Sequence, residues 1–330
     1  MKENINSSER SNKNNFSSIA YNVPLADKNW FQTGGSAKYF CQPKTALEFK
    51  QALDFAKEKK LEIFILGQGA NILISDQGFD GLVICPSLLR ISHKDKDQQA
   101  VYITVGSGMT MSDLIEYCLQ NNIIGLEEFS GIPGTVGGSV YINLHYFQFL
   151  LADFLHSATV INSKTGLVEV VDNAWFEFGY NTSTLHNKDY FLVDATFVLQ
   201  KASDIEVAYA RGRRVEIIRH RHARYPSTHT CGSFFRNFHP DEVTKLIEGT
   251  NKKMIYVAYY LDKIGVKGAL SCGDAVVSHQ HANMIVNKGA ATTTDIINLV
   301  RKMQQKVYDE FAIIPQPECQ LIGFKKYPLL

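Results

Sequence analysis

The sequence predicts an α+β fold in which a larger N-terminal region precedes a smaller C-terminal domain. From residue 44 onward, amphipathic helical segments alternate with short apolar runs, and glycine-rich turns separate several of those runs. A further amphipathic helix comes late in the chain, at residues 292–311. With 330 residues, of which 45% are hydrophobic, the chain is long enough to bury two or three cores of usual size.

Each helical segment carries its own starting signal. The segment KTALEFKQALDFAKEKK begins with a Thr45–Glu48 capping pair, and a second helix is expected to begin after Thr110. The apolar stripe of the first helix consists of Leu47, Phe49, Ala52, Leu53 and Ala56, and that of the late helix of Ile296, Ile297, Val300, Met303 and Val307. Strands are predicted at residues 61–66, 71–75, 81–85, 101–108, 158–162, 167–171 and 190–199.

Composition also divides the chain into regions. We expect a disordered tail at residues 1–20, which are rich in asparagine and serine and lack the apolar run of a secretory signal. Residues 21–207 form the larger region, in two α+β subdomains at about 21–86 and 87–207, and residues 208–330 form the C-terminal domain. The absence of a signal in the tail predicts a cytoplasmic protein.

Charge and cysteine usage restrict the partners. The net charge of +1 gives no global field toward nucleic acid or an anionic membrane, and the six cysteines are scattered singly, without metal-binding spacing. The most apolar stretch, VYINLHYFQFLLADFL, is interrupted by polar residues and is too short to span a bilayer. We therefore expect a small-molecule ligand, no metal, no nucleic acid and no membrane, while the oligomeric state is not indicated.

Two glycine-rich loops, LGQGANILIS and GIPGTVGGSVYIN, are candidates for anion binding. Glycine lets backbone N–H groups approach phosphate oxygens closely, although each loop alone is more typical of a tight turn. Neither loop matches a P-loop or a clean Rossmann fingerprint, so FAD in another fold fits the pair best. The candidate cofactor-binding residues are Leu66, Gly67, Gln68, Gly69, Ala70, Asn71, Gly131, Pro133, Gly134, Thr135, Gly137 and Gly138.

Several motifs in order make a specific resemblance. From about residue 21 to 326 the chain resembles the UDP-N-acetylenolpyruvoylglucosamine reductase (MurB) family, through WFQTGGSAKYF, LGQGANILISD, GIPGTVGGSVYIN, GSFFRNF, GVKG, SHQHANMIVN and PQPECQLIG. The resemblance implies an FAD-binding domain of the vanillyl-alcohol oxidase (PCMH) type and a C-terminal α+β substrate-binding domain. It also implies NADPH as reductant and a nucleotide-sugar enolpyruvyl ether as substrate, in peptidoglycan precursor synthesis.

The resemblance assigns roles to particular residues. Ser233 matches the family's proton donor, and Glu318 matches a catalytic glutamate that helps polarise the enolpyruvyl group. Without the resemblance, Ser233 is more simply a turn hydroxyl and Glu318 a solvated side chain. The expected substrate-binding residues are Tyr180, Arg236, Asn237, His281 and Asn283.

Two departures from the family pattern stand out. The family usually has Y-R-x-S where this chain has GYNTS, so the catalytic arginine is replaced by Asn181. The family also places small residues after the asparagine equivalent to Asn143, whereas this chain continues with LHYFQF. A diverged flavoenzyme with another substrate, or a non-catalytic flavin- or nucleotide-sugar-binding protein, is therefore the alternative to the reductase.

The basic segment ARGRRVEIIRHRHARYP contains His220 and His222, which raise the possibilities of a metal or nucleic-acid site. No third ligand follows at metal spacing, and no aromatic residues interleave with the arginines. A solvated basic helix face is the better interpretation.

Overall fold

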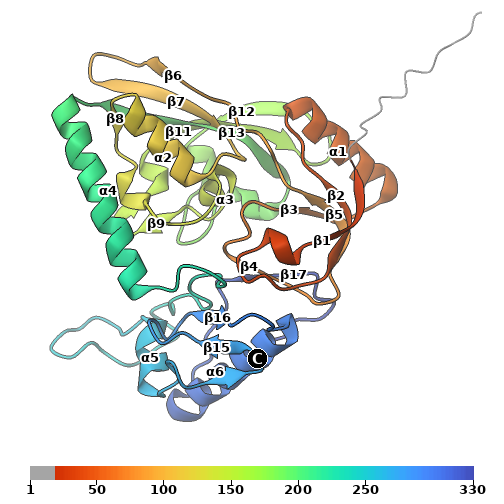
Figure 1. Ribbon diagram of the computed structural model, residues 1–330, viewed down its shortest axis with the longest axis vertical. Coiled ribbons are helices and arrows are strands. Elements are labelled where there is room, and N and C mark those ends of the chain that lie inside the picture. The colour runs from red at the N-terminus through yellow and green to blue at the C-terminus, as the bar shows by residue number, and fades with distance from the viewer. Residues whose placement is uncertain (1–18) are drawn as a thin grey trace, which may run out of the picture.

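The computed structural model describes residues 19–330, which form a larger N-terminal region above a smaller C-terminal domain (Figure 1). The predicted tail at residues 1–20 falls mostly outside the described residues, and Ala20 already belongs to a strand. The first sheet has the order β1-β2-β5-β3, with β1 (Ala20–Pro24), β2 (Ser36–Cys41), β5 (Phe79–Ile84) and β3 (Ile63–Ile65).

Helix α1 (Ala46–Lys59) packs against this first sheet. As predicted, its N-cap is Thr45, whose side chain accepts a hydrogen bond from the N–H of Glu48. Four of the five predicted stripe residues are buried, but Leu47 is 65% exposed. Leu47 lies two residues before Phe49, about 200° around the helix, so it faces away from the buried stripe.

A second, larger sheet forms the other half of the N-terminal region. Its main path is β12 (Val168–Asp172), β11 (Leu155–Asn162), β13 (Tyr190–Lys201), β7 (Ala100–Gly106) and β6 (Ile91–Asp95), with β8 (Ile123–Ile124) also paired to β13. The helices of this half are α2 (Met111–Gln120), α3 (Val136–Tyr141) and α4 (Asp204–Arg224). Buried side chains from the sheet and from these helices form one continuous hydrophobic core.

Helix α4 is the basic segment, and it is attached to the second half rather than fully solvated. Arg213 donates twice to the carboxylate of Glu128, at 2.7 and 2.9 Å, and Arg211 and Arg214 both pair with Glu116. The helix runs without a break through residues 207 and 208, where the domain boundary was predicted. That boundary stays a prediction.

The C-terminal domain packs two helices on a small sheet. Its elements are α5 (Val257–Lys263), β14 (Ser271–Cys272), β15 (Ala275–Val277), β16 (Ile285–Asn287) and α6 (Thr293–Phe311). All five residues of the predicted late stripe are buried, so the predicted amphipathic helix is confirmed. Within residues 19–330, no helix is both long enough and apolar enough to cross a membrane.

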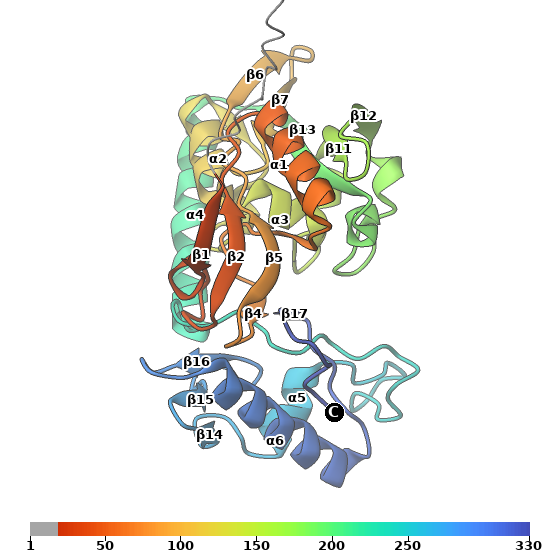
Figure 2. The same ribbon diagram turned by 90° about the vertical axis from the view of Figure 1, so that its right-hand side faces the viewer.

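The chain returns to the N-terminal region at its end. Strand β17 (Gln320–Ile322) pairs in parallel with β4 (Ile72–Ile74), and Figures 1 and 2 show these two strands side by side between the two parts of the molecule. The remaining short strands, β9 (His145–Tyr146) and β10 (Phe149–Leu150), form a hairpin. The β4–β17 pair brings residues near 318 next to residues near 71.

Candidate active site

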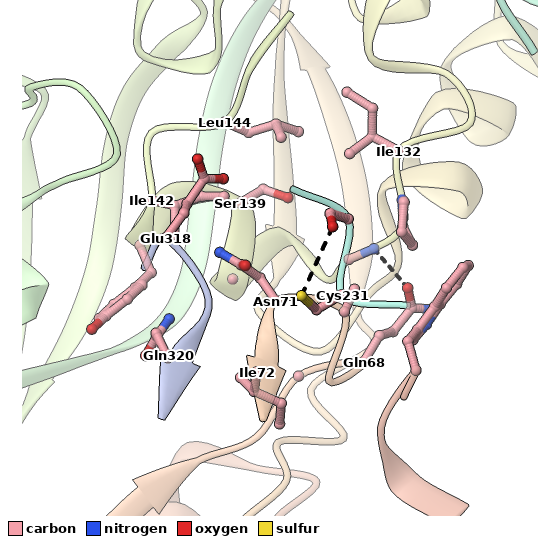
Figure 3. Close-up of a pocket in the computed structure, with 18 of the residues that line it drawn as sticks. Gln68, Asn71, Ile72, Ile132, Ser139, Ile142, Leu144, Cys231, Glu318 and Gln320 are labelled. Carbon is pink, nitrogen blue, oxygen red and sulfur yellow. Dashed lines mark hydrogen bonds between the residues drawn. The ribbon is translucent and has the colours of Figure 1, made fainter. Parts of the chain in front are cut away.

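A cavity of about 1110 Å³ is lined by residues from both parts of the molecule. Its walls come from the two glycine loops, the β9–β10 hairpin, the end of α4 and several segments of the C-terminal domain, some of which Figure 3 shows. Small-ligand pockets usually measure about 300–1,000 Å³. This cavity therefore has room for a large cofactor or for a cofactor together with a substrate.

The first glycine loop, residues 67–71, lines the cavity. The loop connects β3 to β4, and within residues 19–330 none of its N–H groups donates to a backbone acceptor. Gly69 has a φ of +66°, and a Cβ there would lie 2.6 Å from both Asn29 Cα and Lys28 O. A close-packed glycine loop with free N–H groups is a suitable nest for a phosphate.

The second glycine loop, residues 131–138, has most of its N–H groups engaged in hydrogen bonds within the protein, one of them with the first loop. The N–H of Gly134 donates to Gln68 Oε1 over 2.7 Å, a bond drawn in Figure 3. The N–H groups of residues 136–138 also donate to protein acceptors, at 2.8 to 3.2 Å. These amides are occupied, so the first loop is the stronger candidate for direct phosphate contacts.

The remaining lining fits FAD, which combines a flat apolar ring system with polar edges and a diphosphate. Among the buried polar atoms without a partner in residues 19–330 are Asn71 Oδ1, Ser107 Oγ and Asn181 Nδ2, and all three residues line the cavity. Ile132 and Ile142 add apolar wall (Figure 3). Leaving such buried atoms unpaired costs free energy, which a ligand with matching donors and acceptors would recover.

Ser233 lies on a rigidly held segment of the cavity wall. Asn283 fixes the backbone two residues further on, because its Oδ1 accepts from Phe235 N at 3.0 Å and its Nδ2 donates to Phe235 O at 2.8 Å. Gly232, with a φ of +78°, makes the preceding turn. Within the described chain, no hydrogen bond occupies the Ser233 hydroxyl, so this hydroxyl is available to a ligand.

Glu318 lies beside the same segment. Its backbone N–H donates to Phe234 O over 2.8 Å, and its side chain lines the cavity just before β17 (Figure 3). Burial raises the pKa of Glu318 to about 7, although the nearby side chain of Asn181 acts in the opposite direction. Near neutral pH a large share of this carboxyl group is therefore protonated and able to donate a hydrogen bond.

Comparison with known proteins identifies the family. Residues 37–172 match the model of an FAD binding domain, and residues 224–322 match that of the UDP-N-acetylenolpyruvoylglucosamine reductase C-terminal domain. The UDP-N-acetylenolpyruvoylglucosamine reductase of Trichormus variabilis is 34% identical over 293 residues, which cover 89% of this chain and 83% of that protein. The chain belongs to the UDP-N-acetylenolpyruvoylglucosamine reductase family.

Two further relatives agree with this assignment. The UDP-N-acetylenolpyruvoylglucosamine reductase of Listeria monocytogenes is 31% identical over 309 residues, covering 93% of this chain and 96% of that protein. The crystal structure of UDP-N-acetylenolpyruvylglucosamine reductase from Thermus caldophilus superposes with a TM-score of 0.72 at 26% identity, covering 91% of this chain and 97% of that chain. The predicted family and the predicted α+β fold with an FAD-binding domain are confirmed.

Asn181, where the resemblance predicts an arginine, lies in a tight turn and lines the cavity. The turn is closed by the Gly179 N–H, which donates to Thr182 O at 3.1 Å, and Asn181 has a φ of +56°. Asparagine tolerates this left-handed conformation better than most residues. The unpartnered Nδ2 of Asn181 makes this residue part of the site. Its neighbour Tyr180, a predicted substrate-binding residue, is 49% exposed and is not among the lining residues.

The predicted substrate-binding residues do not all reach the cavity. Asn237 and His281 line it, and so does Asn283, although the amide of Asn283 is committed to the backbone of Phe235. Arg236 is not among the lining residues. Its two guanidinium nitrogens Nη1 and Nη2 bind the carboxylate of Glu242, each at 2.7 Å, so this fork is already occupied.

One cation in the cavity wall is missing from the sequence-based prediction. Arg221, near the end of α4, lines the cavity, and its Nε donates to Gly131 O at 3.1 Å. Its guanidinium lies 5.6 Å from the ring centre of Tyr146 and 5.3 Å from that of Tyr225. The tyrosine four residues after Arg221 was a usable signal, because it marks a helix face that is packed rather than solvated.

Proposed function

We propose that the chain is an NADPH-dependent flavoenzyme that reduces UDP-N-acetylglucosamine enolpyruvate to UDP-N-acetylmuramate, a step in peptidoglycan precursor synthesis. The observation that supports this most directly is the convergence of Ser233 and Glu318 in one cavity with the first glycine loop. These residues come from segments far apart in the sequence. A chain that had lost this chemistry would have no reason to bring them together.

The cofactor would be held mainly by the first glycine loop. The free N–H groups of residues 67–71 would bind the diphosphate, and the apolar wall beside Ile132 and Ile142 would face the ring system. When bound, FAD supplies the hydride chemistry, because it accepts a hydride from NADPH and passes it to the enolpyruvyl carbon–carbon double bond. One hydride and one proton together saturate that bond.

Ser233 is proposed to supply the proton. A serine hydroxyl is a weak acid in water, so it needs a fixed position against the reacting carbon, which the turn at Gly232 and the Asn283 clamp provide. Glu318, whose pKa lies near 7, would donate a hydrogen bond to the substrate in its protonated form and stabilise developing negative charge. Asn237 and His281 would bind the rest of the substrate.

The location is proposed to be cytoplasmic, with a soluble nucleotide sugar as the partner. All six cysteines are free, two of them, Cys231 and Cys319, near the site. Free thiols and a nicotinamide reductant both suit a reducing compartment.

The proposal can be tested on purified protein without oxygen. We expect NADPH to bleach the flavin absorbance, and addition of UDP-N-acetylglucosamine enolpyruvate to restore it within one turnover. Bleaching without restoration would favour a flavoenzyme of the same fold with another substrate. A protein that retains no flavin, or whose flavin NADPH does not bleach, would instead indicate a binding protein without this activity.

A further inference from the structure

The two departures from the family pattern meet in one wall of the cavity. The β9–β10 hairpin, which contains the bulky residues, lies against the turn of Asn181: the ring centres of His145 and Tyr180 are 5.2 Å apart. Buried Asn143 ties the two together, because its Nδ2 donates to Gly179 O at 3.2 Å and its Oδ1 accepts from Ala152 N at 3.2 Å. The replaced arginine and the added histidine are therefore neighbours in space.

The other cations of the cavity are engaged elsewhere. Arg221 lies between two tyrosine rings and donates to Gly131 O, on the wall formed by the second glycine loop and α4. Lys188 lies 3.9 Å from the carboxylate of Glu62. His281 is next to Tyr225, at 5.5 Å between ring centres, and His222 belongs to α4. Among the described lining residues, His145 is the basic side chain that contacts the Tyr180–Asn181 turn.

An enolpyruvyl group carries a carboxylate, and this carboxylate needs donors where it enters the site. The Asn181 turn offers one donor, the unpartnered Asn181 Nδ2. Glu318 beside it can donate a hydrogen bond only when it is protonated. Burial keeps the pKa of His145 below its usual value, against an opposing hydrogen bond to the Asn143 backbone, so the empty site avoids a buried positive charge. A bound carboxylate would reverse that preference and favour the imidazolium.

We infer that His145 binds the carboxylate of the enolpyruvyl substrate, together with the amide of Asn181, and so takes over the cationic contact of the arginine that this chain lacks. The inference rests on the proposed function. The contact would be specific for the carboxylate, which is the group that UDP-N-acetylglucosamine lacks.

The test uses holoenzyme and the variant His145→Ala. KM for UDP-N-acetylglucosamine enolpyruvate should rise roughly tenfold to a hundredfold, the scale of one lost charge-assisted hydrogen bond. Affinity for UDP-N-acetylglucosamine, which lacks the carboxylate, should stay within about twofold by calorimetry. His145→Gln, which keeps an N–H donor, should recover part of the KM.

Leu150→Ala is the matched control, because Leu150 is the strand partner of His145 in the hairpin and is not a lining residue. It should leave KM nearly unchanged. An unaltered KM in His145→Ala would overturn the inference, and so would an equal loss of affinity for the two nucleotides, which indicates a structural role. If the unmodified enzyme is not reoxidised by the enolpyruvyl nucleotide, the proposed function itself has failed, and the inference fails with it.

Discussion

Ser233 is a single hydroxyl whose removal separates the two halves of the proposed reaction. Because the hydroxyl acts on the substrate and not on the reductant, Ser233→Ala should keep its flavin and be bleached by NADPH at the normal rate. Reoxidation by the sugar nucleotide should slow by about 10² to 10⁴, the usual scale for a lost general acid. Stopped-flow absorbance measures both steps separately. Full-speed reoxidation in this variant would remove Ser233 from the mechanism.

Glu318 is a residue whose effect should appear in the pH dependence of stability. Burial raises its pKa from 4.5 to about 7, so the folded protein binds a proton that the unfolded chain releases between these values. The contribution of this group to the free energy of unfolding is fully present below the unfolded pKa of 4.5. The free energy of unfolding then falls as the pH rises toward 7. The loss is on the order of 3 kcal/mol when the carboxylate is ionised.

The comparison variant is Glu318→Gln, which cannot ionise. Thermal unfolding of both holoproteins should show the melting temperature of the parent falling relative to that of Glu318→Gln as the pH rises from 4.5 to 7.5. A difference in melting temperature that is constant over this range would show that the carboxyl group titrates normally.

At the scale of elements, the first glycine loop should be the part that retains the cofactor. Gly69→Val would force a β-branched side chain into a φ of +66° and against the backbone of residues 28 and 29, so the N–H groups of the loop would move. The protein should purify without flavin absorbance. Gly212→Ala is the control, because a Cβ at Gly212 meets nothing within 4 Å in helix α4 and should be neutral or slightly stabilising. A yellow Gly69→Val would show that the loop is only a turn.

The elements that could be predicted are those with a local signal. Helix α6 was predictable because its buried stripe repeats with the helical period and Thr292 caps its start. Strand β17 was not predictable. Its three residues pair in parallel with β4, which lies almost 250 positions earlier in the chain, and no local sequence pattern encodes that partner. The same distinction holds in the site. Local motifs predicted Ser233 and Glu318, whereas the Arg236–Glu242 pair could not be predicted because it depends on how a loop folds back.

At the scale of the whole molecule, the β4–β17 pair is the joint between the N-terminal region and the C-terminal domain, and this joint positions Glu318. Strand β4 follows the first glycine loop and β17 follows Glu318, so their pairing sets the distance between cofactor loop and glutamate. Just after β4, the Asp76 carboxylate accepts from the N–H groups of Thr293 and Thr294, both at 2.9 Å, and from the Thr294 hydroxyl at 2.8 Å. These N–H groups belong to the first turn of α6, where intrahelical partners are lacking.

Asp76→Ala should therefore loosen the joint while both cores stay intact. Losing a carboxylate that serves three donors should cost about 1 to 3 kcal/mol and lower the melting temperature. Flavin content should remain, since the loop of residues 67–71 is untouched, but KM for the sugar nucleotide should rise because Glu318 is less well placed. Asp80→Ala is the control: its carboxylate pairs with Lys38 at the surface with 84% side-chain exposure, and such pairs contribute little. If Asp76→Ala and Asp80→Ala melt alike and share the parent KM, the β4–β17 pair holds the joint without help from α6.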